Sequence, residues 1–242
     1  MTASDDSGAP DGDAGIDDDT DSVVVSDIPI VATRFVILDP DDATVGDDVV
    51  VTIRAVDDFD NVDTTYQSDV TLALTGSATG AGLVDVVNGV GTRNVSDTVP
   101  ETVPLSLSDT EATGLVVTST RELAFSAGPT SEYLLSDPGD TTAGTRIAYE
   151  LTRRDEFGNL ATLGSETAYL YSDAGSPAAF FDAASGGSQI TSVVIGNALS
   201  SAMFWYENEQ AVSDTIFVSD DDLEPDGTDG IDDAEDAVAI SP

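Results

Sequence analysis

The sequence contains no cysteine, no histidine and no lysine. Without cysteine the chain can form no disulfide, and thiolate chemistry and the usual zinc sites are excluded. The absence of histidine removes the side chain that most often transfers protons in enzymes near neutral pH. Serine and aspartate are plentiful, but no partner base is present to activate a serine nucleophile. We therefore expect a protein that is not an enzyme.

Long apolar runs are missing as well. A membrane-spanning helix needs about 18 or more consecutive apolar residues, and the sequence contains no such stretch. We therefore expect no membrane insertion. No basic, apolar signal segment opens the chain, so we expect either a mature or recombinant piece or another route to the cell surface.

Positive charge is scarce. The 242 residues include 47 acidic and 7 basic side chains, which gives a net charge of −40, and all seven basic residues are arginines. This charge repels phosphate and anionic lipid, so nucleic acid is excluded as an expected partner and cations are favoured. Two explanations remain open: an acidic surface adapted to concentrated salt, where repulsion is screened within a few ångströms, or specific calcium sites built from carboxylates. We expect calcium sites at the two ends and salt adaptation in the middle.

The clearest positive feature is an internal repeat. Residues 35–72 align with residues 133–170 at a constant offset of 98, without a gap. Asp39-Pro40 matches Asp137-Pro138, and single matches are Gly46 with Gly144, Phe59 with Phe157 and Asn61 with Asn159. A period of about 100 residues is too long for most solenoids, so each copy should have a core of its own.

Both copies read as short strands. Residues 49–56 are rich in β-branched side chains, and Val49, Val51, Ile53 and Ala55 fall on one face. Strands recur about every ten residues between Gly, Asp and Asn, which indicates an all-β sandwich or barrel. We predict an acidic tail over 1–29, a first domain over 30–127, a second over 128–219 and an acidic segment over 220–242, with only a short hinge between the domains.

These features resemble the bacterial immunoglobulin-like repeats of large cell-surface and secreted proteins. The resemblance rests on an opening aromatic residue with Asp-Pro, on Val45-Gly46 and Ala143-Gly144 before a strand, and on residues 155–159 after it. A late aromatic strand, residues 203–211, completes the pattern, and residues 104–114 are its expected counterpart in the first copy. Asp60 stands where the second copy has Gly158, so the turn is expected to differ between the domains. The resemblance covers about residues 30–219, and it implies two tandem immunoglobulin-like β-sandwiches.

A second repetition joins the two ends. Residues 11–21 align with residues 226–236 at an offset of 215 and share a Gly-Ile-Asp-Asp core. Both segments resemble calcium-binding repeats of the thrombospondin type 3 style, because closely spaced Asp offers convergent oxygens and Gly permits the sharp backbone path. The predicted calcium ligands are Asp11, Asp13, Asp17, Asp18 and Asp21 at the start and Asp226, Asp229, Asp232, Asp233 and Asp236 at the end. A solvated tail is the alternative.

Two internal features have both a structural and a functional interpretation. Asp57, Asp58 and Asp60, with Asp155 and Glu156, are candidate calcium ligands near the domain junctions, but such residues also form turns. In the late strand, alternation places Phe204 and Tyr206 on one face and Trp205 on the other, so one face should be core. Trp205 is then the main candidate for binding a carbohydrate.

The sequence therefore predicts a non-catalytic, extracellular or cell-surface module with a structural or adhesive role, stiffened by calcium. Its expected partners are calcium ions and other copies of itself or neighbouring repeats of a larger chain. One alternative is a self-assembling filament or surface-layer subunit, joined by strand exchange or calcium bridging. A carbohydrate-binding module is the other.

Overall fold

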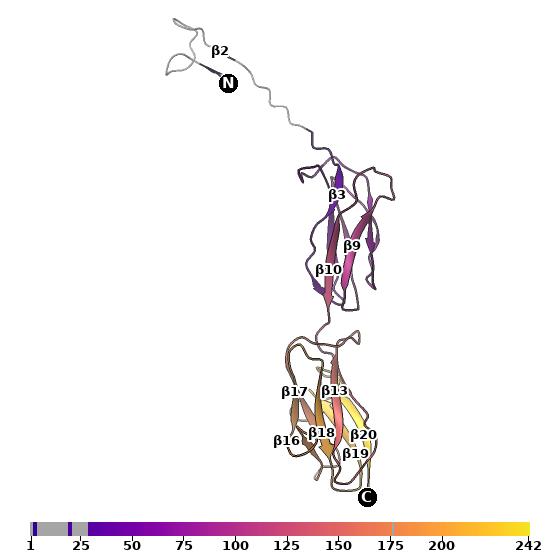
Figure 1. Ribbon diagram of the computed structural model, residues 1–242, viewed down its shortest axis with the longest axis vertical. Coiled ribbons are helices and arrows are strands. Elements are labelled where there is room, and N and C mark those ends of the chain that lie inside the picture. Colours follow the sequence, from indigo (N-terminus) through magenta and orange to yellow (C-terminus); the bar gives the residue numbers. More distant parts are fainter. Residues whose placement is uncertain (1, 4–18, 21–28, 176) are drawn as a thin grey trace.

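The computed structural model describes residues 2–3, 19–20, 29–175 and 177–242. Over these residues it contains only strands, turns and loops, which confirms the all-β prediction. No helix in this part of the chain is long and apolar enough to cross a membrane. Two short N-terminal strands, β1 (Thr2–Ala3) and β2 (Asp19–Thr20), pair antiparallel. The remaining strands form two sandwiches that lie end to end (Figure 1).

The first sandwich has a three-stranded sheet, in the order β3-β5-β8, and a five-stranded sheet, in the order β4-β10-β9-β6-β7. The pairs are antiparallel except for β4 with β10. Its strands are β3 (Arg34–Ile37), β4 (Ala43–Thr44), β5 (Val49–Val56), β6 (Val70–Leu74), β7 (Gly82–Val84), β8 (Val90–Val95), β9 (Thr102–Ser108) and β10 (Thr120–Ser126).

The second sandwich has two five-stranded sheets, in the orders β11-β13-β18-β15-β16 and β12-β20-β19-β14-β17. Its strands are β11 (Glu132–Leu135), β12 (Thr141–Thr142), β13 (Ile147–Arg154), β14 (Glu166–Ser172), β15 (Ala179–Phe181), β16 (Gln189–Ile190), β17 (Ser192–Ile195), β18 (Ser201–Glu207), β19 (Ser213–Ser219) and β20 (Ala234–Ser241).

Each sandwich has its own core, built by alternation along the strands. In β5 the side chains of Val51, Ile53 and Ala55 are fully buried, as their spacing predicts. The second core is richer in aromatic rings: Tyr149 stacks on Phe204 with 5.4 Å between ring centroids. Because the two cores share no residue, the chain forms two independent β-sandwich domains.

The late aromatic strand has a different counterpart from the one predicted. β18 pairs with β13 in the same register as β8 pairs with β5. Residues 203–211 therefore correspond to the end of β8 and the residues that follow it, and not to residues 104–114. The alignment fails here because the second domain inserts the β15–β16 hairpin between β14 and β17. The inserted β15 pairs with β18 and widens that sheet.

The C-terminal boundary also differs from the prediction. β20 lies in the segment that was expected to be separate, yet it pairs along β19, and Val238 and Ile240 are buried in the second core. Successive side chains of a strand point to opposite faces, so β20 can bury its apolar face in the sandwich while its other face, of acidic and small residues, points to the solvent. The second domain therefore extends to Ser241, and residues 220–233 are its last loop.

Candidate functional site

The acidic C-terminal loop is held closed by hydrogen bonds between its own residues. Between β19 and β20, the amide of Asp233 donates to the carbonyl of Gly227 at 2.7 Å, and the amide of Gly227 donates to Oδ2 of Asp233, also at 2.7 Å. Gly227 and Gly230 have φ angles of +81° and +83°, a region that favours glycine. Ile231 packs against the second core and anchors the loop.

Three carboxylates converge in this loop. Oxygen atoms of Asp220, Asp226 and Asp233 lie within 4.8 Å of one another. Oδ1 of Asp233 is buried and has no hydrogen-bond partner among the described residues. Partial desolvation, followed by the charges of Asp233 and Asp220, raises the pKa of Asp226. A cation would relieve this repulsion, and three carboxylates with nearby carbonyls and water match the oxygen ligands that calcium prefers.

The structure groups only some of the predicted ligands. Asp226 and Asp233 are in the cluster, whereas Asp229 and Asp232 have exposed side chains outside it. Asp236 lies in β20 and accepts a hydrogen bond of 2.8 Å from the Tyr149 hydroxyl. Asp220, which precedes the repeated motif, was not among the predicted ligands. Its signal was the run of three aspartates directly after β19.

The N-terminal set, Asp11, Asp13, Asp17, Asp18 and Asp21, lies outside the described residues.

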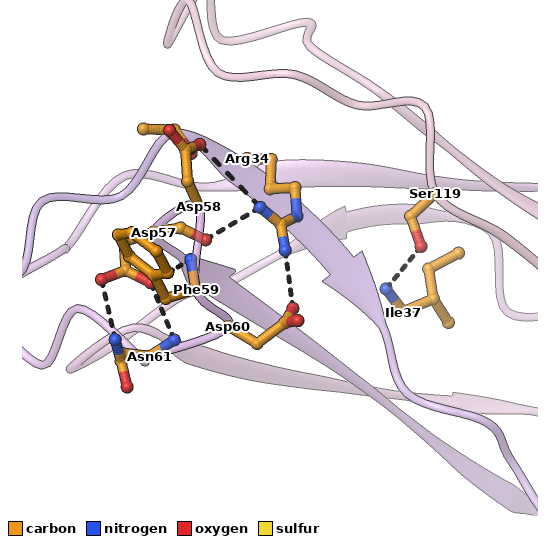
Figure 2. Close-up of polar contacts among 9 residues, drawn as sticks. Arg34, Ile37, Asp57, Asp58, Phe59, Asp60, Asn61 and Ser119 are labelled. Carbon is orange, nitrogen blue, oxygen red and sulfur yellow. Dashed lines mark hydrogen bonds and ion pairs between the residues drawn. The ribbon is translucent and has the colours of Figure 1, made fainter.

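The internal set, Asp57, Asp58 and Asp60, shapes a turn at the end of the first domain that lies away from the second. Both oxygens of Asp57 accept hydrogen bonds, from the amides of Phe59 and Asn61 and from the Asn61 side chain (Figure 2). The bonds from Asn61 and Phe59 lower the pKa of Asp57. Arg34 donates to Oδ1 of Asp60 at 2.6 Å and lies 4.0 Å from Oδ1 of Asp58. The three carboxylates are thus engaged by the turn and by Arg34.

The equivalent turn of the second domain, residues 155–159, has the same hydrogen bonds. Oδ1 of Asp155 accepts from the amides of Phe157 and Asn159, and the Asp155 amide donates to the Asn159 carbonyl. Asp60 and Gly158 both have positive φ angles, +66° and +80°. The prediction that the two turns differ is therefore wrong. Aspartate is among the residues that tolerate a positive φ, so Asp60 adopts the same backbone conformation as Gly158.

The second turn forms the junction between the domains. The Asn159 side-chain amide donates to the Thr98 carbonyl of the first domain at 2.8 Å. The Phe157 ring lies on Gly46, where an added Cβ would be 2.7 Å from the ring. A hollow of about 210 Å³ is lined by Phe157 and by residues of the first domain that include Gly46 and Thr98.

The aromatic strand β18 divides as alternation predicts. Phe204 and Tyr206 are fully buried, which confirms that this face is core. Trp205 is half-buried on the other face, opposite Phe181 of β15. The Arg146 guanidinium lies over the Phe181 ring, 3.3 Å from the ring centroid. Of these two aromatic side chains, Trp205 is therefore the better candidate for contact with a ligand.

The sequence matches no protein-family model, and no curated protein sequence matches it. Many solved structures resemble the fold. One is invasin, a bacterial integrin-binding protein, with a TM-score of 0.53 and 11% identity over 88% of this chain and 41% of that one. An Escherichia coli adhesin, FdeC, gives a TM-score of 0.48 and 19% identity over 88% of this chain and 66% of that one. The Yersinia pseudotuberculosis adhesin InvE gives 0.39 and 14% over 88% and 60%. This chain thus spans about two fifths to two thirds of these proteins.

The likeness to invasin confirms the fold class. Both domains are immunoglobulin-like β-sandwiches in tandem. At this level of identity the likeness concerns the fold alone, because such sandwiches support many functions.

Proposed function

We propose that the chain is a non-catalytic structural and adhesive module of an extracellular or cell-surface protein. The observation that carries this proposal is the end-to-end arrangement of two immunoglobulin-like sandwiches that resembles invasin over 88% of the chain. Such a rod holds a binding surface away from the cell. The short junction and its contacts at Gly46 and Thr98 favour a limited hinge over a flexible linker.

Calcium is the proposed stiffening ion in this module. The cluster of Asp220, Asp226 and Asp233 supports one site, in the loop that ties β19 to β20. Neutralising these carboxylates would remove their mutual repulsion and fix the loop. Because the loop also bonds to β11, through the Tyr133 amide and the Asp232 carbonyl at 2.9 Å, the ion would stabilise both sheets of the second domain.

The calcium site can be tested by calorimetry on chelator-treated protein in dilute and in multimolar potassium chloride. We expect saturable binding that persists in high salt and is lost in Asp226→Asn, whose side chain is exposed and is not needed to close the loop. Asp232→Asn removes a neighbouring exposed carboxylate outside the cluster and should bind as the wild type does. Equal binding by the two variants, or no saturable binding, would leave salt adaptation as the explanation of the acidity.

The surface role needs a separate test. An antibody against the second domain should label intact cells of the source organism, and deleting the gene should reduce their attachment to surfaces. Labelling only after lysis would contradict the proposal. A carbohydrate ligand is a further candidate because Trp205 lies outside the core, and it predicts a change in tryptophan fluorescence on adding a glycan.

A further inference from the structure

The chain contains one turn twice. Among the described residues one copy is docked on another domain, and the other, called the undocked turn below, is not. In the second domain the turn at Asp155–Asn159 contacts the end of the first domain, as described above. In the first domain the same turn, Asp57–Asn61, follows β5 beside the start of β3, at the end of the sandwich that lies away from the second domain (Figure 1). Phe59 there is 84% exposed, whereas Phe157 at the junction is 41% exposed.

The undocked turn is already in the docked conformation. Its carboxylate, Asp57, holds the amides of Phe59 and Asn61 at 2.9 Å, and Asp155 holds those of Phe157 and Asn159 at 3.0 and 2.9 Å. Docking therefore requires no rearrangement of the turn backbone, which lowers the entropic cost of binding.

The opposite end of the chain carries the matching seat. At the junction the ring of Phe157 rests on Gly46, whose φ is +87° and whose amide donates to the Asp97 carbonyl at 2.7 Å. At the end of the second domain Gly144 has a φ of +76°, and its amide donates to the Asn208 carbonyl at 2.9 Å. A Cβ added to Gly144 would meet nothing within 4 Å among the described residues.

We propose that the Asp57–Asn61 turn is a docking element for a second copy of this chain, and that it seats Phe59 on Gly144 at the end of that copy's second domain. The contact would repeat the junction already present inside the chain. The side-chain amide of Asn61 would then donate to the carbonyl of Glu209, which follows β18 as Thr98 follows β8. This inference is independent of the calcium site.

The contact joins two different surfaces, so it does not close on itself. Heterologous contacts of this kind produce rings or open filaments. Because the two sandwiches lie end to end, repeating their junction adds length along the rod, and an open chain of molecules follows (Figure 1).

Charge makes the contact dependent on salt. The turn contributes Asp57, Asp58 and Asp60, which Arg34 neutralises in part, and the seat has Glu209 beside it. At about 1 M salt the screening length is about 3 Å, so repulsion across the contact is largely removed, whereas burial of the Phe59 ring is retained. We expect association to strengthen as potassium chloride is raised.

Mixing two defective variants provides the sharpest test. Phe59→Ser removes the docking ring, and Gly144→Asn blocks the seat with a residue that tolerates positive φ. In about 3 M potassium chloride, sedimentation should show concentration-dependent chains for the wild type and monomers for each variant alone. An equal mixture should stop at dimers, because each variant retains one intact end. Leu223→Ser is the matched control, since Leu223 is 83% exposed in another loop, and it should associate as the wild type does.

Disulfide trapping can detect the contact even if it is too weak for sedimentation, because the covalent bond accumulates. This sequence has no cysteine, so only the introduced cysteines can cross-link. Chains with Asn61→Cys and chains with Glu209→Cys should cross-link when mixed, about tenfold or more faster than chains with Leu223→Cys and Glu209→Cys. Adding Phe59→Ser should abolish this difference in rate.

If the Phe59→Ser variant associates as strongly as the wild type, the contact between copies lies elsewhere. A wild type that stays monomeric up to about millimolar concentration, without selective trapping, would show that the turn serves another partner or none. Either result overturns the proposal.

Discussion

Asp155 fixes the position at which the second domain begins, and its removal is the most informative perturbation of the fold. The residue is 1% exposed. Oδ2 accepts a hydrogen bond of 2.9 Å from the buried amide of Gly128, in the segment that arrives from the first domain. Oδ1 accepts from the amides of Phe157 and Asn159 at 3.0 and 2.9 Å. One carboxylate thus joins the incoming chain to the turn that forms the junction.

The loss in Asp155→Ala follows from these partners. A buried donor left without an acceptor costs about 1–3 kcal/mol, and bonds to a charged group are at the upper end of the range. The Gly128 amide bears the full cost, whereas water can reach the amides of the turn in part. We expect the free energy of unfolding of the second domain to fall by about 3 kcal/mol, which corresponds to a drop in Tm of about 10–20 °C for a domain of this size.

The same carboxylate makes the stability of the second domain depend on pH in the acid range. Burial alone would raise the pKa of Asp155, but the hydrogen bonds from Gly128, Asn159 and Phe157 outweigh it and hold the pKa below the ordinary value of 3.8. Stabilisation by this group is therefore fully present above about pH 4 and is lost as the pH falls through the lower, folded-state pKa. In Asp155→Ala this part of the acid transition should be absent.

The assay uses the single tryptophan, Trp205, which reports on the second domain only. Denaturant unfolding followed by its fluorescence, at fixed potassium chloride, gives the stability of that domain without interference from the first. Asp57→Ala is the matched control, because the same turn in the first domain should leave the Trp205 transition unchanged. If Asp155→Ala unfolds at the same denaturant concentration as Asp57→Ala, the assignment of Asp155 as an anchor is wrong.

Three further predictions concern the cores and the junction. Arg153→Lys should lower the stability of the second domain by about 2–4 kcal/mol in the tryptophan assay, because an ammonium cannot reach the several carbonyls that the buried guanidinium binds. Gly46→Ala places a Cβ 2.7 Å from the Phe157 ring and should loosen the junction in small-angle scattering, whereas Gly139→Ala, at a similar φ with open space around it, should not. Leu105→Ala should destabilise the first domain by about 2–5 kcal/mol, measured by circular dichroism, and leave the tryptophan transition unchanged.

Much of the fold could be predicted from the sequence because the repeat and the strand alternation are local signals. The alternation in β5 and β18 gave the buried faces correctly. The prediction failed where the second domain inserts the β15–β16 hairpin, because an offset established over 35–72 cannot reveal a later insertion. It failed again at β20, where the acidic composition of residues 220–242 hid a strand with buried Val238 and Ile240.

The candidate site was predicted less well, because ligand convergence depends on the path of the loop. Asp226 and Asp233 meet since the loop closes on itself at Gly227, and Asp220 joins them from the end of β19. Spacing alone gave the same weight to Asp229 and Asp232, whose side chains lie outside the cluster. The contact of Phe157 with Gly46 was not visible either, because a similar turn in two copies does not show which copy meets a neighbouring domain.

Arginine suits what several of the basic residues do in this chain. Several of them donate to backbone carbonyls in loops and along the edge strand β7. Arg93 donates to the carbonyls of Leu83 and Ala81 at 2.9 and 2.8 Å, and Arg153, which is fully buried, donates to that of Leu199 at 2.8 Å. A planar guanidinium has five donors in a fixed fork, whereas an ammonium is a strongly hydrated point charge. In a chain of net charge −40, surface lysines could reduce repulsion, but they could not hold these loops. Arg93 and Arg153 are therefore placed where the geometry of the guanidinium is needed, and most of the acidic surface is left to be neutralised by ions from the solvent.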